Sequence, residues 1–248
     1  GHGIELGFDG SASTVITSAK PSADAIDING QTSGTSTDGK GLNFWSGAAT
    51  TYVKIAATGL RGNVKLTGSA STSSMPGVSI NWARILSTTG TVTIDSGTNP
   101  TTFGASSTSS AVYLGADTAG GATGNIDINA GSLTWAGTVN ARTTGDLTID
   151  SGSSQSFASG VTIASNLSLA EVSNVRIGTA GTSAASQNTA NVTLAGALAS
   201  AGNIRVYGGD IAANANVTGN GLDGQILLKA TGSISQAVST AQIGRAHV

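Results

Sequence analysis

The chain has 248 residues, with 36 glycines, no cysteine, 10% charged residues, 4% aromatic residues and a net charge of −2. Disulfides and thiolate metal sites are therefore excluded, and the 11 scattered lysines and arginines do not predict a basic face for nucleic acid. No apolar run approaches the roughly 20 residues of a membrane-spanning helix, so we predict no membrane span. Low charge combined with regular apolar spacing favours an ordered chain over a disordered one.

Taken in chain order, residues 1–50 predict less regular turns, and residues 51–55 predict a short strand. From residue 62 a five-residue pattern recurs: a small residue, a polar turn residue, an apolar residue, a variable residue and a second apolar residue. Its nine instances are residues 62–66, 90–94, 124–128, 145–149, 165–169, 173–177, 190–194, 202–206 and 224–228.

Each instance predicts a half-buried strand. Side chains alternate between the two faces of a strand, so the two aliphatic residues share a buried face and the middle residue points outward. The middle residue is polar in every instance except that of Leu227. Helices are not expected, because Gly, Ser, Thr and Asn interrupt every segment long enough to form one.

The spacing of the instances predicts how the strands are arranged. Intervals of about 20–22 residues recur, and further short strands are predicted between the instances, at residues 111–114 and 161–163. We therefore predict an all-β fold, a single-stranded right-handed parallel β-helix (β-solenoid) with about 20–22 residues per turn. About ten to twelve turns would give a rod about 50 Å long.

A β-sandwich is the structural alternative, because it also contains short strands at regular spacing. The turn position favours the β-helix, since stacked turns allow asparagine amides to form a ladder. Six of the nine instances have asparagine there: Asn63, Asn125, Asn166, Asn174, Asn191 and Asn203.

The domain prediction is one β-helix segment over residues 1–242. Residues 243–248 match the translation of the start of a widely used sequencing adapter. We interpret them as a non-native tail and exclude them from the fold.

No catalytic, cofactor-binding or metal-binding residue is predicted, and we expect the chain not to be an enzyme. His2 and His247, the two histidines, lie near opposite ends of the chain. Residues 208–210 and the glycines Gly120, Gly121 and Gly124 predict turns, because neither a calcium-binding nonapeptide nor a phosphate-binding lysine accompanies them.

Carboxylates clustered beside a basic residue would suit a polysaccharide-cleaving β-helix, but solvated outward carboxylates are the favoured interpretation. The acidic residues concerned are Asp95, Asp127, Asp146, Asp150 and Asp210.

Aromatic and threonine positions predict no binding track. The alternation places Trp82 and Trp135 inside, and the remaining candidates for sugar stacking point outward but are scattered. These are Trp45, Tyr52, Tyr113 and Tyr207. A flat ice-binding rank of Thr93, Thr148 and Thr193 is not expected, because charged residues occupy the equivalent positions. Those charged residues are Lys65, Asp127, Arg176 and Arg205.

The Gly-Asn-apolar-x-apolar repeats, and phrases such as residues 226–236, resemble the filamentous-haemagglutinin-like adhesins and related β-strand-repeat exoproteins of Gram-negative bacteria. The resemblance covers most of residues 50–240. It implies two-partner secretion through an outer-membrane pore, a long β-helical shaft, and a role in attachment or biofilm formation. The Asn-Pro-Asn motifs of the family's secretion module are not expected here, because Asn99 and Pro100 are followed by Thr101.

The resulting hypothesis is a structural shaft segment of a large secreted or cell-surface bacterial adhesin or exoprotein. Its expected partners are the outer-membrane secretion pore during export and host or matrix glycans or proteins. Three alternatives stay open: an autotransporter passenger, an S-layer or matrix protein, and a β-helical polysaccharide-processing enzyme.

Overall fold

The computed structural model describes residues 1–7, 13–33, 38–46, 51–104, 111–118, 121–135, 138–150, 160–163, 174–178, 191–195, 197–219, 224–236 and 243–245. Within these residues the fold is all-β, with strands β1 to β25 and no helix. Every pairing between the described strands is parallel. Antiparallel hairpins, which build most β-sandwiches, are therefore not found in this part of the chain.

The strands form four sheets, of which two contain the most strands. The nine-stranded sheet contains, in order, β1 (Ile4–Leu6), β4 (Leu42–Phe44), β7 (Val78–Ile80), β10 (Pro100–Phe103), β13 (Ser132–Trp135), β16 (Gly160–Ile163), β18 (Val192–Leu194), β21 (Ile211–Ala213) and β24 (Ile234–Ser235). The eight-stranded sheet contains β3 (Asp24–Gln31), β6 (Asn63–Ser69), β9 (Val92–Asp95), β12 (Ile126–Asn129), β15 (Leu147–Asp150), β17 (Val175–Ile177), β20 (Ile204–Gly208) and β23 (Ile226–Ala230).

Two shorter sheets complete the described structure. The five-stranded sheet contains β2 (Thr14–Ser18), β5 (Val53–Ala57), β8 (Ala83–Ser87), β11 (Ala111–Gly115) and β14 (Thr138–Ala141). The three-stranded sheet contains β19 (Leu198–Ser200), β22 (Val217–Gly219) and β25 (Ile243–Arg245). β25 comes from the segment interpreted as a non-native tail; its pairing with β22 does not bear on the origin of these residues, and that interpretation stays a prediction.

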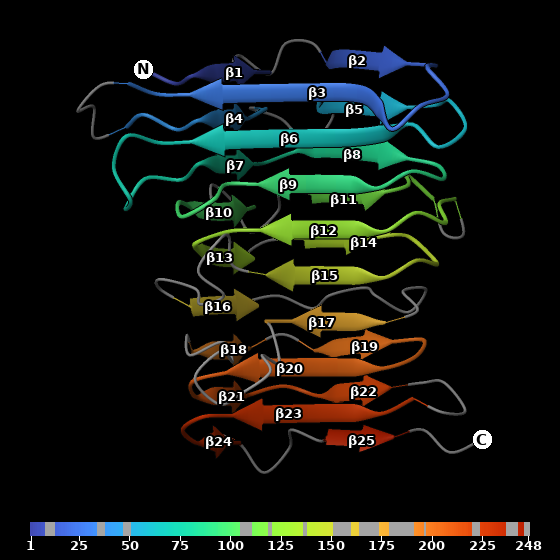
Figure 1. Ribbon diagram of the computed structural model, residues 1–248. Coiled ribbons are helices and arrows are strands. Elements are labelled where there is room, and N and C mark those ends of the chain that lie inside the picture. The colour runs from blue at the N-terminus through green and yellow to red at the C-terminus, as the bar shows by residue number, and fades with distance from the viewer. Residues whose placement is uncertain are drawn as a thin grey trace.

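The chain visits the sheets in rotation. From β1 to β15 it passes from the nine-stranded sheet to the five-stranded sheet, then to the eight-stranded sheet, and back again. In Figure 1 the eight-stranded sheet faces the viewer, and β19, β22 and β25 lie on the same side of the molecule as the five-stranded sheet (β2, β5, β8, β11 and β14). Successive rounds stack from the N-terminus at the top to the C-terminus at the bottom (Figure 1). This order is compatible with a β-helix.

The repeated motifs meet in one sheet, as the sequence predicts. Seven of the nine instances form β6, β9, β12, β15, β17, β20 and β23. Their aliphatic residues are in register, so that Val64 pairs with Val92 and Ile126 pairs with Leu147. The instance containing Val192 lies instead in the nine-stranded sheet. The instance at residues 165–169 lies outside the described residues.

The predicted period describes only the tightest rounds. Ile126 and Leu147 are 21 positions apart, and Ile204 and Ile226 are 22 apart, but Ile4 and its partner Leu42 are 38 apart. The additional residues lie between strands, where the spacing of the motifs alone does not fix their number. Nine strands in the longest described sheet, at about 4.8 Å per strand, give a stack about 40 Å tall, shorter than predicted.

The core consists of columns of inward side chains that continue from layer to layer. Leu66, Ile94 and Ile128 pair across β6, β9 and β12, and each is at most 1% exposed. In the nine-stranded sheet, Phe103 and Trp135 pack edge-to-face with their ring centroids 5.1 Å apart. The aliphatic and aromatic residues of all four sheets thereby share one continuous apolar interior.

The corner before the eight-stranded sheet explains the small residue that begins each motif. Gly62, Gly90, Gly124 and Gly145 stack there, and the last three each face the carbonyl group of the glycine one layer earlier. A Cβ atom added at Gly145 would lie 2.5 Å from the oxygen of Gly124, which is closer than real Cβ atoms approach. At Gly90, Gly124 and Gly145 glycine is therefore required by the closeness of successive turns.

The next motif position forms the polar ladder that the sequence predicts. Asn63 Oδ1 accepts a hydrogen bond of 2.8 Å from Thr91 N, and Asn203 Oδ1 accepts one of 2.9 Å from Gln225 N in the next layer. Asn174 Oδ1 accepts from Asn203 Nδ2 at 2.9 Å, and Asn174 Nδ2 donates to Asp146 Oδ1 at 2.8 Å. These side chains satisfy turn amides that would otherwise have no strand partner. Asn166 lies outside the described residues.

We expect Ile94→Ala to reduce the free energy of unfolding by about 2–5 kcal/mol, because it leaves a cavity between two fully buried neighbours. Thermal unfolding followed by circular dichroism measures the change. Thr93→Ala on the same strand is the matched control and should change stability by less than about 0.5 kcal/mol, because Thr93 points outward. Equal effects for the two variants would contradict the inward assignment.

We expect Asn174→Ala to cost about 1–3 kcal/mol, because it removes hydrogen bonds to the layers on both sides. Asn191→Ala is the comparison, since within the described residues Asn191 Oδ1 accepts one bond, from Asp210 N at 2.9 Å, at an exposed position. Chemical denaturation should rank Asn174→Ala as the more damaging substitution. The reverse order would show that the ladder does not hold the turns together.

Candidate functional site

The outer face of the five-stranded sheet carries a row of cationic and aromatic side chains. Lys54 of β5 lies in register with Arg84 of β8, and Arg84 lies in register with Tyr113 of β11. The alternate residues Val53 and Ile55 are fully buried, whereas the three residues of the row are half-buried. The rotation of the chain through the sheets therefore makes neighbours of residues from three different rounds.

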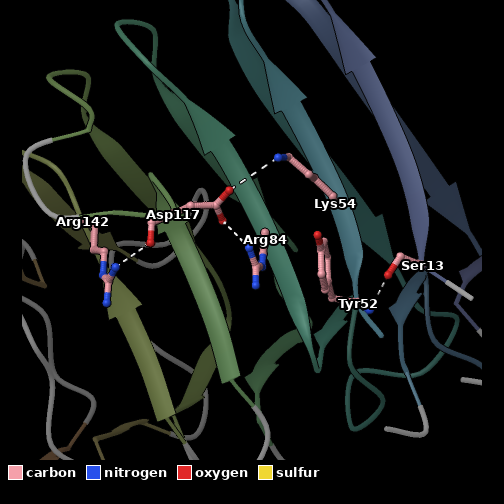
Figure 2. Close-up of polar contacts among 6 residues, drawn as sticks. All are labelled: Ser13, Tyr52, Lys54, Arg84, Asp117 and Arg142. Carbon is pink, nitrogen blue, oxygen red and sulfur yellow. Dashed lines mark hydrogen bonds and ion pairs between the residues drawn. The ribbon is translucent and has the colours of Figure 1, made fainter. Parts of the chain in front are cut away.

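Asp117, which follows β11, connects this row. Its Oδ2 lies 3.4 Å from Lys54 Nζ, and its Oδ1 lies 3.2 Å from Arg84 Nη1. Arg142 donates from Nη1 to the carbonyl oxygen of Asp117. Figure 2 shows Lys54, Arg84 and Arg142 arranged around Asp117. We call the following residues the outer-face cluster: Tyr52, Lys54, Arg84, Tyr113, Asp117 and Arg142.

Two tyrosine rings hold the guanidinium groups of the cluster. Arg84 Cζ lies 4.0 Å from the ring centroid of Tyr52 and 5.4 Å from that of Tyr113. Arg142 Cζ lies 5.0 Å from the Tyr113 centroid. Both arginines are within the range of cation–π attraction. The backbone of Tyr52 is tied to the neighbouring round, because its N–H donates to Ser13 Oγ at 3.2 Å (Figure 2).

The outer-face cluster is locally positive in a chain whose net charge is −2. Lys54, Arg84 and Arg142 stand against the single carboxylate of Asp117. The side chains of Lys54, Arg84 and Asp117 retain 30%, 33% and 29% of their exposure. Ion pairs this exposed contribute at most about 1 kcal/mol each, so stability alone does not account for gathering them.

A hollow of about 240 Å³ adjoins the outer-face cluster, between the outer face of the sheet and the segment that follows β11. Lys54 and Asp117 belong to both the hollow and the cluster. Most of the other lining residues are small or carry a hydroxyl group, including Thr17, Thr58, Thr88 and Thr118. Leu86, which also lines the hollow, is only 8% exposed.

The outer face of the eight-stranded sheet gathers four of the five acidic residues considered from the sequence. Asp95 and Asp150 align with Asn129 between them, and Asp127 aligns with Thr93 and Thr148. The fourth residue, Asp146, immediately precedes β15. Asp210 is separate: it lies between β20 and β21, and its Oδ1 accepts hydrogen bonds of 2.8 Å from Ser233 N and Oγ.

The contacts of these carboxylates are mainly structural. Asp150 Oδ2 lies 2.9 Å from Arg176 Nη1, Asp95 Oδ1 accepts from Asn129 Nδ2 at 3.1 Å, and Asp146 takes part in the asparagine ladder. A hollow of about 300 Å³ beside them is lined by Asp146, Thr148, Asn174, Arg176, Asn203 and Arg205, among others. Among the described residues, no group of three His, Cys, Asp or Glu side chains is placed to hold a metal ion.

The pKa values of Asp127 and Asp210 are shifted from the usual value of an aspartate. Burial raises the pKa of Asp127 above the usual value, the nearby Arg176 partly opposes this shift, and Asp146 adds to it. The two hydrogen bonds from Ser233 lower the pKa of Asp210. The two carboxyl groups are therefore shifted in opposite directions, by burial in one case and by hydrogen bonding in the other.

The other candidate residues from the sequence lie apart from both faces or take structural roles. His2 Nδ1 accepts from Lys40 N at 3.2 Å, and His2 Nε2 lies 3.5 Å from Glu5 Oε1. His247 and Gly120 lie outside the described residues. Residues 208–210 cover the end of β20 and the turn after it, and Gly124 belongs to the stacked corner.

The aromatic predictions have mixed outcomes. Trp135 is fully buried as predicted, and Tyr52 and Tyr113 lie on the outer face as predicted. Trp82 is only half-buried, because the chain turns with a φ of 50° just before β8 and breaks the alternation.

Tyr207 is 7% exposed, although alternation points it outward. Gly208 and Gly209 beside it are also buried, so this end of β20 is covered. Trp45 is half-buried.

Sequence reasoning missed the outer-face cluster because its residues lie on, or directly beside, strands outside the main motif. The available signal was the second strand of each round, at residues 53–57, 83–87 and 111–115. Aligning these segments places Lys54, Arg84 and Tyr113 in one column. Tyr52 and Tyr113, which are scattered in the sequence, in fact both contact Arg84. The expectation that the aromatic residues form no binding track stays a prediction.

Comparison with known proteins gives no match to any family model, any curated protein or any solved structure. In the part of the chain that the structure describes, there is no helix with the length and apolar character needed to cross a bilayer.

We expect Asp127→Asn to raise the unfolding temperature at neutral pH, because it removes the cost of keeping a half-buried carboxylate charged. A raised folded-state pKa stabilises the fold below the unfolded value of about 3.8, and this contribution is lost as the pH rises through the folded value. The advantage of the variant should therefore shrink as the pH falls toward 3.8.

Asp210→Asn is the control of opposite sign. The pKa of Asp210 is lowered, so its carboxylate stabilises the fold above the unfolded value and this contribution is lost on acidification. The variant should be less stable than the parent at neutral pH and equal to it in acid. Melting curves recorded at several pH values test both variants, and parallel pH profiles would contradict the assignment.

Proposed function

We propose that the chain forms a single-stranded, right-handed parallel β-helix and serves as a shaft segment of a large secreted or surface-exposed bacterial adhesin or exoprotein. One observation carries the proposal: among the described strands, each sheet gains its next strand only after the chain has visited at least one other sheet. A structure that grows in this way extends along one axis, and its stability increases with each neighbouring layer.

The direction of the strands supports the right-handed assignment. In Figure 1 the rear strands β1, β2, β4 and β5 point to the right and the front strands β3 and β6 point to the left, while the chain descends. Seen from the N-terminal end, the chain then turns clockwise as it moves away from the observer. Right-handed connections are also the strong rule for parallel strands joined by a crossover.

The interior and the surface support a shaft rather than a container. Buried aliphatic columns fill the space between the sheets, and the polar ladder closes a corner of the turns. The outward-facing side chains of the strands do not fill this interior, so they can contact other molecules. Together with the repeat resemblance, this supports attachment or biofilm roles at the cell surface. An autotransporter passenger or an S-layer or matrix protein would use the same kind of shaft.

The absence of cysteine supports export through an outer-membrane pore, because no disulfide has to be opened before translocation. In this proposal the pore is a transient partner. Host or matrix glycans or proteins are the lasting ones.

A second candidate is a β-helical polysaccharide-processing enzyme. The observation that favours it is the gathering of Asp95, Asp127, Asp146 and Asp150 on one outer face with Arg176 among them. Two carboxyl groups with separated pKa values are the usual requirement for glycoside hydrolysis. Against it, Asp146 and Asp150 are engaged by Asn174 and Arg176.

Two measurements separate the shaft from the enzyme. Beads coated with the chain should be retained on biofilm matrix or cell layers more strongly than beads coated with albumin. The soluble chain should release no reducing or unsaturated ends from polygalacturonate, alginate or xylan. Release that disappears in both Asp127→Asn and Asp146→Asn would overturn the shaft proposal in favour of the enzyme, and retention no better than albumin would remove the adhesive role.

A further inference from the structure

Arg84, at the centre of the outer-face cluster, is fixed by its contacts within the protein, but these contacts do not engage all of its N–H donors. Its guanidinium contacts the Tyr52 and Tyr113 rings, and its Nη1 donates to Asp117 Oδ1 at 3.2 Å. A guanidinium group has five N–H donors. In the described part of the chain, the remaining donors of Arg84 have no acceptor, and the side chain is one-third exposed.

A guanidinium fixed in this way is suited to a planar anion. Its donors form a rigid fork that matches the two oxygens of a carboxylate. Because the two rings and Asp117 already restrict the side chain, little conformational entropy remains to be lost when a ligand binds. The site therefore favours a ligand that carries carboxylate groups.

The cations of the outer-face cluster are distributed along the long axis of the stack. Lys54 lies one strand before Arg84, and Arg142 follows β14, two strands after the strand of Arg84. Neighbouring strands are about 4.8 Å apart, which is similar to the length of one sugar ring in a polymer. A chain with a negative charge on each unit would meet several of these cations at once.

The surroundings of the outer-face cluster favour a sugar polymer over an acidic peptide. The adjoining hollow offers the hydroxyl groups of Thr17, Thr58, Thr88 and Thr118, which can exchange hydrogen bonds with sugar hydroxyls. Peptide docking depends on apolar anchors that fill desolvated pockets. Leu86, the large aliphatic residue of the lining, is almost completely buried.

The geometry points to a docking site for an acidic polysaccharide built of uronic-acid sugars on the outer face of the five-stranded sheet. Arg84 binds a carboxylate through its free donors, Lys54 and Arg142 bind the carboxylates of neighbouring units, and the threonine-lined hollow accepts a sugar ring. This inference deepens the proposed function, since an adhesive segment requires a ligand and this one supplies its chemical class.

Affinity electrophoresis of the whole chain in native gels tests the inference, with polygalacturonate as the probe and neutral dextran as the uncharged control. The chain should be retarded by polygalacturonate and not by dextran, and added salt should weaken the retardation. Absence of retardation by polygalacturonate would overturn the inference. Retardation that is equally strong with an oligonucleotide, or equal flotation with anionic lipid vesicles, would overturn the assignment to a polysaccharide.

The variants locate the site. Arg84→Gln should raise the Kd by about tenfold, and Arg84→Lys should recover only part of the affinity because it restores the charge without the fork. Arg205→Gln, at an exposed outward position of β20 on another face, is the matched control and should bind like the parent. Loss of binding in the control as large as in Arg84→Gln would overturn the location.

Two further measurements keep the outcome decisive. Melting temperatures show whether each variant is folded, and Lys54→Gln replaces Arg84→Gln if the latter unfolds; unchanged affinity in Lys54→Gln would then count against the site. Bead retention on surfaces free of acidic polysaccharide reports on the proposed function separately. Retention there, combined with no polygalacturonate binding, would overturn this inference alone.

Discussion

Backbone hydrogen bonds between successive layers hold the described strands in parallel register, as from Val92 N to Asn125 O and from Val175 N to Asn203 O. Register decides everything that follows, because a shift by one residue would exchange the inward and outward faces of a strand. With the register fixed, the same structural position in every layer faces the same neighbours. Aliphatic residues accumulate into columns, glycines into a tight corner, and amides into a ladder.

The same constraint separates folding from function. Inward positions are limited to residues that fill the interior, as with Ile94 between Leu66 and Ile128. Outward positions have no such limit, so a charged or aromatic residue there costs the fold little. The outer-face cluster uses this freedom: Lys54, Arg84 and Tyr113 occupy outward positions of three strands whose inward residues are ordinary core residues.

The sequence predicted what repeats and missed what varies. The motif with Val64, Ile126 or Leu147 at its first apolar position predicted the strands, their buried face and their stacking, because each of these depends on local alternation. The length of a round was not predictable, since Ile4 and Leu42 are joined by residues that follow no pattern. Trp82 and Tyr207 were misplaced for a related reason: a positive φ and covering chain segments override alternation.

The candidate site was beyond the reach of the sequence for a different reason. Asp117 lies outside any strand, and its contacts with Lys54 and Arg84 depend on how the chain turns after β11. Local patterns carry no information about such a turn. The cation–π contacts could be anticipated only by someone who already knew which rounds are neighbours, and the lengths of the rounds conceal that information.

The asparagine ladder also exposes the protein to chemical ageing. Asn174 Nδ2 donates a hydrogen bond to Asp146, and Asn174 Oδ1 accepts one from Asn203. Deamidation would replace the donor with a second carboxylate facing Asp146, and two like charges would then confront each other across adjacent layers. Deamidation of this one side chain would therefore push two adjacent layers apart. The corner of the β-stack would weaken as the protein ages.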